Sequence, residues 1–459
     1  MSQRLLIRDA IVVSMDPVIG VLPRGSLFVE DGRIVDVRPD LEIEDCQTID
    51  GTDQIVLPGL IDAHRHLWYS PVRGDFMDGV FAGLLSDLYP RVVERFTAPD
   101  LYAATRAGLL MALDRGVTTV FDWCHALNSP EHVDAAVQGH LDMPARGVFG
   151  FGASTQRKLA ELQLGRAPAD SWELARQLRK GRLSSDTGRL TMALALQSPD
   201  VSPMDQVIVD VSVARELQLP ISMHVGTPAG RPKGSIDQLA AVGLLDHDMQ
   251  FVHCCSSTDA EFGLLASHGC STVICPSVEL LMGTGVPPIA RAHRAGLRPA
   301  FGTDSVVAGA SDLLEEARIG LALARAQVLA DVVRAGESLV NGSQLGMSSM
   351  EALAAVTIHA AAACGLERDI GSLTPGKRAD VIMLRAADSN LWPMTSVVQS
   401  LVGSASGGNV EFVIVDGSVI KANGRFVELD PAAIRADLQR VRDHLNTRSP
   451  RPAPALGTR

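Results

Sequence analysis

The middle of the chain alternates short hydrophobic runs with stretches in which hydrophobic residues recur at helical spacing. The hydrophobic runs lie at residues 55–62, 117–122, 146–152, 190–196, 220–224, 249–253, 271–275 and 298–304. This alternation is typical of a parallel sheet whose strands are joined by helices. Eight strand–helix units in succession form a TIM barrel. The sequence therefore predicts an α/β protein with a (β/α)8 barrel over residues 58–369.

The two ends of the chain show a different pattern, with short β-type runs broken by turn residues such as Asp31-Gly32 and Asp50-Gly51. Neither end is long enough to build a sheet domain alone, so we expect residues 1–57 and 370–428 to form one small β-sandwich domain. A C-terminal helix is predicted over residues 429–447. The last segment, residues 448–459, is rich in proline and basic residues and is predicted to be disordered.

Residues that bind metals follow three of the predicted barrel strands. His64 and His66 end the first strand, where residues two apart point the same way. His224 ends the fifth strand and Asp304 ends the eighth. The carboxyl ends of barrel strands meet on one face, so these four side chains should converge. Three imidazoles and a carboxylate suit Zn²⁺, although Fe²⁺ or Mn²⁺ would also accept these ligands.

Other polar and aromatic residues are expected around this metal. Asp304 would also act as the general base, and His253, at the end of the sixth strand, could stabilise a developing oxyanion. Trp68 and Arg73 lie in the loop after His66. Trp68 could contact a small, flat or hydrophobic substrate and Arg73 a carboxylate or carbonyl on it, or the loop could simply pack onto the barrel. His125, after the second strand, could bind substrate or make a structural hydrogen bond.

Composition limits the classes of partner. The 459 residues are 46% hydrophobic and 20% charged, which suits a large folded core. The net charge of −12 argues against nucleic acid or an anionic membrane as a partner. No hydrophobic run reaches the length of a membrane span, and the first residues lack the hydrophobic region of a signal peptide, so we expect a cytoplasmic protein. The seven cysteines include no Cys-x-x-Cys pair, so no disulfide framework is indicated; a Cys254–Cys255 nucleophile is the alternative to a packing role.

As an ordered set, these motifs resemble the amidohydrolase superfamily, in the branch that contains cytosine deaminase and the triazine hydrolases. The resemblance rests on Pro58-Gly-Leu-Ile-Asp-Ala-His-Arg-His66, His224, His253 and Phe301-Gly-Thr-Asp304, with residues 358–363 and 371–382 as further support. It implies a metal-dependent hydrolase of a non-peptide C–N bond in a small molecule. Deamination of a heteroaromatic or cyclic amine by a metal-activated water is the favoured reaction, and a homodimer is expected.

Two departures from this branch affect the expected chemistry. Binuclear members of the superfamily carry a carboxylated lysine, but no lysine lies in the fourth strand, residues 190–196, so a single metal ion is expected. Thr227 stands where deaminases of the branch have a glutamate that shuttles protons, and a hydroxyl cannot do this. Glu279, after the seventh strand, could replace that acid or could cap the following helix. The alternatives are therefore hydrolysis of an amide, carbamate or cyclic ureide, or a lyase or isomerase reaction on the same metal scaffold.

Overall fold

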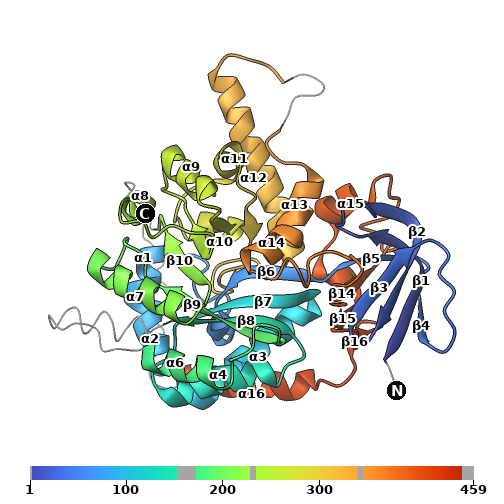
Figure 1. Cartoon of the computed structure of the whole chain (residues 1–459), viewed down its shortest axis with the longest axis horizontal. Helices are drawn as coiled ribbons and strands as arrows, with labels where there is room; N and C mark the ends of the chain where they lie inside the picture. Colours follow the sequence, from blue (N-terminus) through green and yellow to red (C-terminus); the bar gives the residue numbers. More distant parts are fainter. Residues whose placement is uncertain (1–2, 153–171, 228–233, 340–344, 447–459) are drawn as a thin grey trace, which may run out of the picture.

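A computed structural model describes residues 3–152, 172–227, 234–339 and 345–446 and contains two sheets (Figure 1). The larger unit is a barrel of eight parallel strands that neighbour one another in sequence order. Almost every strand residue is buried, as expected when helices cover the outside of a parallel sheet. The barrel strands are β6 (Leu60–Arg65), β7 (Val117–Cys124), β8 (Arg146–Gly152), β9 (Leu190–Leu196), β10 (Ile221–Val225), β11 (Met249–His253), β12 (Ser271–Ile274) and β13 (Ala300–Phe301). The predicted (β/α)8 architecture is confirmed.

Helices follow the barrel strands and form the outer layer. Several begin at capping boxes, in which the N-cap side chain and the third helical residue satisfy each other's backbone N–H groups, as at Thr97 with Asp100 and Thr258 with Glu261. The outer elements are η1 (Leu67–Val72), α1 (Phe81–Gly83), η2 (Leu84–Leu88), α2 (Tyr89–Val93), α3 (Ala98–Asp114), α4 (Pro130–Leu141), α6 (Trp172–Lys180), α7 (Met204–Glu216), α8 (Ser235–Ala241), α9 (Asp259–Ser267), α10 (Pro276–Leu281), α11 (Ile289–Arg294), α12 (Leu313–Arg334), α13 (Ser349–Ala355) and α14 (Ile358–Ala363).

The second sheet joins both ends of the chain, as predicted, and lies beside the barrel (Figure 1). Its strands are β1 (Arg4–Val13), β2 (Val21–Glu30), β3 (Arg33–Arg38), β4 (Gln47–Asp50), β5 (Gln54–Pro58), β14 (Val381–Arg385), β15 (Val410–Val415), β16 (Ser418–Ala422) and β17 (Arg425–Phe426). They are hydrogen-bonded as one continuous sheet, because the first part of β1 pairs with β4 and the second part with β5. Side chains from both parts, such as Leu5 and Met383, share one hydrophobic core, so the sheet encloses its own interior.

Two elements complete the C-terminal part: α15 (Val397–Ser404) and α16 (Pro431–Asn446). The helix predicted over residues 429–447 is present as α16, which packs against α3 and η1. The predicted disorder of residues 448–459 lies outside the described residues. The domain boundaries proposed from the sequence stay predictions.

The first predicted strand is divided between the two sheets, which corrects the sequence analysis. Residues 55–62 were expected to form a single barrel strand, but β5 pairs with β14 in the terminal sheet and β6 begins the barrel at Leu60. The crossing point is Gly59, where an added Cβ would lie 2.1 Å from the Thr118 side-chain oxygen on β7. Only glycine allows the backbone to pass so close to β7, so the two sheets meet there.

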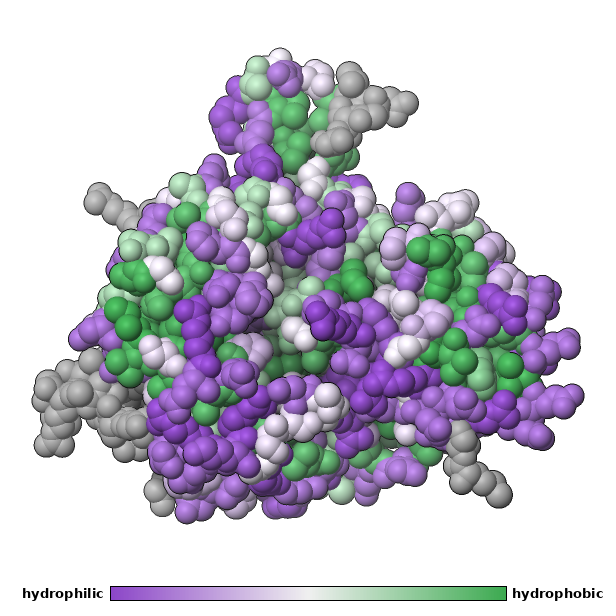
Figure 2. Space-filling model, viewed as in Figure 1, coloured by the Kyte–Doolittle hydropathy of each residue, from purple (hydrophilic) through white to green (hydrophobic). Residues whose placement is uncertain are grey.

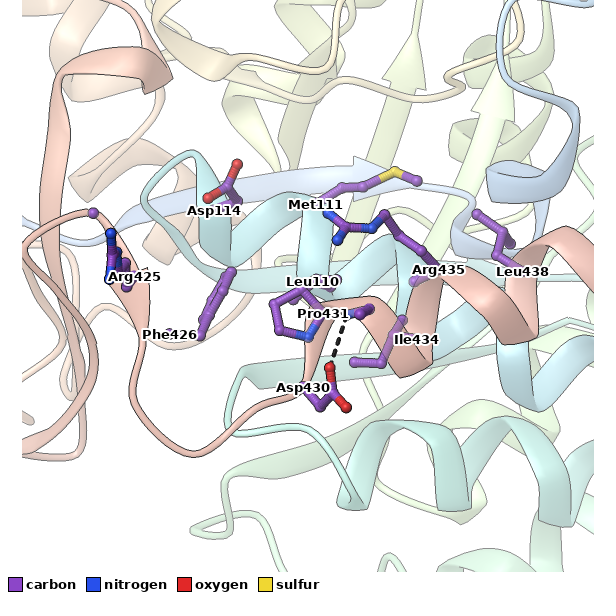
Figure 3. Close-up of a pocket in the computed structure, with 13 residues that line it drawn as sticks. Leu110, Met111, Asp114, Arg425, Phe426, Asp430, Pro431, Ile434, Arg435 and Leu438 are labelled. Carbon is purple, nitrogen blue, oxygen red and sulfur yellow. Dashed lines mark hydrogen bonds between the residues drawn. The ribbon is translucent and has the colours of Figure 1, made fainter.

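The surface has two features away from the barrel strands. The far end of α12 projects beyond the barrel, and Leu329 and Val333 are exposed on it (Figure 2). A cavity of about 560 Å³ lies between α3 and α16, with Leu110, Phe426 and Ile434 in its walls (Figure 3). Among the residues that the structure describes, no helix combines the length and hydrophobicity needed to cross a membrane.

A buried ion-pair cluster fastens the terminal sheet to the barrel. Arg146, at the start of β8, donates to both carboxylate oxygens of Asp380, at 2.7 and 3.2 Å, and to Asp416. Arg146 is 4% exposed, so its charge depends on these partners rather than on water.

We therefore expect Arg146→Met to lower the free energy of unfolding by about 3–5 kcal/mol, because it leaves the buried Asp380 without its cation. Urea denaturation followed by circular dichroism measures the change. Arg334→Met is the matched control, since Arg334 pairs with Asp331 on the exposed end of α12 and should contribute far less. Equal losses in the two variants would contradict this account of the interface.

Candidate metal centre

The four predicted ligands converge at the carboxyl ends of the barrel strands. His64 and His66 come from the end of β6, and His224 comes from β10. The Nε2 atoms of His64 and His224 lie 3.1 Å apart. Oδ1 of Asp304 lies 3.2 Å from Nε2 of His66 and 3.6 Å from Nε2 of His64. The structure thus brings these four side chains together, and their role as metal ligands stays a prediction.

These separations match the requirements of a single small cation. Tetrahedral Zn²⁺ binds imidazole nitrogen at about 2.0–2.1 Å, which places neighbouring ligand atoms about 3.3 Å apart. The tautomer of His66 also fits, because its Nδ1 lies 2.6 Å from the carbonyl oxygen of Trp123. Donation of the Nδ1 proton to that carbonyl leaves the Nε2 lone pair directed at the centre. The donor set therefore fits one divalent metal ion.

Burial keeps the imidazoles of His64 and His224 in the neutral form that a metal needs. Desolvation lowers the pKa of His64 to about 4 and holds the pKa of His224 well below its usual value. Burial opposes ionisation of Asp304, but its contacts with the rings of His64 and His66 outweigh this effect and keep the pKa of this carboxyl well below its usual value. The site therefore offers neutral nitrogen ligands and an ionised oxygen ligand together.

Backbone hydrogen bonds between the first and last barrel strands hold the ligands in register. The Asp304 amide donates to the His64 carbonyl at 2.9 Å, and the His66 amide donates to the Asp304 carbonyl at 2.8 Å. Asp62 reinforces this join, since its carboxylate accepts bonds from the amide and hydroxyl of Thr303 at 2.9 and 2.5 Å. Asp304 has a φ of +53°, a left-handed conformation that these contacts maintain.

His253 and Glu279 form a buried pair beside the ligands. Nε2 of His253 lies 3.8 Å from Asp304, and its Nδ1 lies 3.1 Å from Oε1 of Glu279. The same Glu279 oxygen accepts a bond from the Cys275 amide, so Glu279 also caps α10. Burial disfavours a charged His253, but the bond to Glu279 and the charges of Asp304 and Glu279 outweigh it and raise the pKa of His253.

The predicted substrate contacts take different positions. His125 lies beside the metal ligands, with its ring centroid 4.7 Å from that of His66, and Trp68 packs against His125 at 5.2 Å. The Arg73 guanidinium contacts Ser311 and Met111, a residue of α3, so its contacts are with the helical layer. Its expected role toward a substrate stays a prediction.

Thr227 follows the His224 strand as expected, and the structure brings an unpredicted carboxylate close to it. Asp200, in the loop after β9, accepts a hydrogen bond from the Gly226 amide at 2.6 Å. Its place after the fourth strand, in Ser198-Pro199-Asp200, was the available sequence signal.

Trp123 was also missed. It lies two residues before His125, and its ring centroid is 4.4 Å from that of His224. The alternation of side chains along a strand would have placed it at the site.

The chain is similar in sequence to known deaminases. The 5-methylthioadenosine/S-adenosylhomocysteine deaminase of Symbiobacterium thermophilum is 29% identical over 437 residues, which cover 91% of this chain and 93% of that protein. The 5'-deoxyadenosine deaminase of Methanothermobacter thermautotrophicus is 26% identical over 423 residues, covering 90% and 92%.

Two solved structures share the fold. An adenosine deaminase from Xanthomonas campestris with bound zinc has a TM-score of 0.80 and 23% identity, covering 96% of this chain and 98% of that one. The atrazine chlorohydrolase from Arthrobacter aurescens TC1, complexed with zinc, has a TM-score of 0.83 and 22% identity, covering 95% and 100%.

A family model matches residues 55–420, which include the barrel and all four ligands. The expected resemblance is confirmed, and so is the expected enzyme class, a hydrolase of C–N bonds other than peptide bonds. This chain belongs to the amidohydrolase family.

Proposed function

We propose that the enzyme removes the amino group from a heteroaromatic ring, with an adenine-type nucleoside as the first substrate class to test. The observation that carries the proposal is that His64 and His66 lie close to both His224 and Asp304. The names of the adenosine-type deaminases among its relatives support the substrate class.

The metal proposed for this site is one Zn²⁺ ion, since three imidazoles and a carboxylate are ligands that zinc prefers; Fe²⁺ and Mn²⁺ are the alternatives. When bound, such an ion lowers the pKa of a coordinated water to about 7. Asp304 accepts the proton of the attacking water and later passes it to the leaving amine. Its low pKa keeps it ionised and ready for the first of these transfers.

We propose that His253 stabilises the negative charge that develops on the atoms bonded to the carbon that the water attacks. Glu279 holds the ring by accepting the Nδ1 proton, so Nε2 faces Asp304 and the reacting atoms. We therefore propose Glu279 as a positioning residue that acts through His253. The two roles considered for it, helix cap and participant in catalysis, are compatible because one oxygen serves both partners.

A second reaction is favoured by one specific observation. Thr227 lacks the acid that would protonate a ring nitrogen during deamination. Hydrolysis of an amide, carbamate or cyclic ureide needs no such step, since the carbonyl oxygen takes up the charge directly. The cytoplasmic location, the homodimer and the substrate contacts of Trp68, Arg73 and His125 stay predictions.

Ammonia release separates the two reactions. We expect the wild-type enzyme to release ammonia from at least one member of a panel of adenosine-type nucleosides, aminopurines, pterins and triazines. His64→Ala gives the background rate. If no panel member exceeds that background while amides or cyclic ureides are hydrolysed, the second reaction replaces the first.

Replacement of Asp304 by Asn tests the general base. Asp304→Asn keeps an oxygen that can face the metal but cannot accept the proton, so we expect turnover to fall roughly 10²–10⁴-fold. The circular dichroism spectrum and most of the bound metal should be retained. Near-normal turnover would remove Asp304 from this role.

Metal analysis tests the site without any substrate. Protein purified without chelator should contain about one equivalent of divalent metal per chain, and His224→Ala should lose most of it because three ligands hold the ion less tightly than four. Inductively coupled plasma mass spectrometry measures the content. His247→Ala, which removes an exposed imidazole, is the matched control. Undetectable metal in the wild-type protein would refute the site.

A further inference from the structure

Trp123 lies near the carboxyl end of β7, directly beside the proposed metal ligands. Its neighbour Asp122 points outward, where it accepts bonds from the His140 ring on α4 and the Leu67 amide. Because successive strand residues face opposite sides, Trp123 faces the barrel interior. Its ring centroid lies 4.4 Å from that of His224 and 5.6 Å from that of His66.

The backbone of Trp123 is hydrogen-bonded to His66, one of the proposed metal ligands. The Trp123 carbonyl accepts the Nδ1 proton of His66, so the backbone of Trp123 and the orientation of a ligand are tied together. The Trp123 ring also packs 5.0 Å from His125, which in turn lies against Trp68. The proposed ligands are thus bordered by flat aromatic rings, which suit a flat substrate.

The indole N–H of Trp123 lacks a partner. Trp123 is 2% exposed, and within the described part of the chain its Nε1 has no hydrogen-bond acceptor. Trp172 shows the usual arrangement, with its buried Nε1 donating to Asp210 at 2.7 Å. A buried donor without an acceptor is costly, and native proteins keep few of them. An unpaired donor among the side chains of a catalytic site is explained if a bound substrate supplies its acceptor.

We propose that the Trp123 indole N–H donates a hydrogen bond to a ring nitrogen or ring carbonyl oxygen of the substrate, and that it thereby selects heteroaromatic rings that carry such an acceptor. An indole N–H is a donor only, so an acceptor is the only partner it can recognise. The inference rests on the proposed function, because it assumes that the substrate ring binds beside His66 and His224.

Trp123→Phe removes the N–H and keeps a flat aromatic ring, although a smaller one. We expect kcat/KM to fall about 10- to 100-fold for substrates with the ring acceptor, the scale on which a site that hydrogen-bonds its substrate discriminates. Metal content should stay at the wild-type level, which separates loss of this bond from damage to the metal site. Trp172→Phe is the matched control: it removes a buried N–H away from the ligands and should leave kcat/KM unchanged.

Substrate analogues give the sharper result. In the wild-type enzyme, replacing the acceptor nitrogen by C–H should reduce kcat/KM, and in Trp123→Phe the two substrates should become equivalent within about threefold. The inference is overturned if Trp123→Phe lowers kcat/KM equally for both substrates or for neither. Ammonia release by the wild-type enzyme would still support the proposed function in that case. If the wild-type enzyme hydrolyses only amides or ureides, kcat/KM of the wild type and of Trp123→Phe is compared on those substrates with and without the acceptor atom. That result then decides the role of Trp123.

A binding measurement completes the test without turnover. The chain has four tryptophans, so the ¹⁵N-indole signal of Trp123 is identified by its absence in Trp123→Phe. With adenosine as the probe and the turnover-deficient Asp304→Asn variant as the protein, we expect this signal to shift downfield. A Trp123 signal that stays in place while others report bound adenosine would overturn the inference.

Discussion

The site depends on the closure of the barrel between its first and last strands. Two backbone hydrogen bonds join Asp304 to His64 and His66, and Asp62 holds the adjacent Thr303. These bonds place a carboxylate from residue 304 against imidazoles from residues 64 and 66, with 240 positions between Asp304 and His64 in the sequence. The same contacts therefore complete the fold and assemble the ligands.

Burial gives the assembled groups their chemical character. Away from water, the imidazoles of His64 and His224 strongly disfavour protonation, while Asp304 stays ionised because the neighbouring rings stabilise its charge. A cation placed among them would meet neutral nitrogen donors and one negative oxygen. The metal ion proposed for this site would therefore give these buried ligand atoms a partner inside a hydrophobic barrel.

The departures from the usual motif concentrate on one side of the site. Thr227 offers no acid, whereas His253 and Glu279 form a buried pair one and two strands further on. Asp200 accepts a hydrogen bond from the amide of Gly226, the residue before Thr227. The site therefore contains carboxylates, but not at the position expected from its branch.

The sequence alone determined the order of the strands and predicted the candidate ligands, because hydrophobic periodicity and polar residues at strand ends are local signals. It also indicated that the termini form a separate sheet. Only the tertiary structure decided where the first strand divides, since Gly59 is required by its distance to Thr118, which no local pattern records. The same holds for the pairing of Glu279 with His253, the turn of Arg73 toward α3, and the place of Trp123 against His224. Each of these is a contact between residues distant in the chain, and such contacts are set by how whole strands and helices pack together.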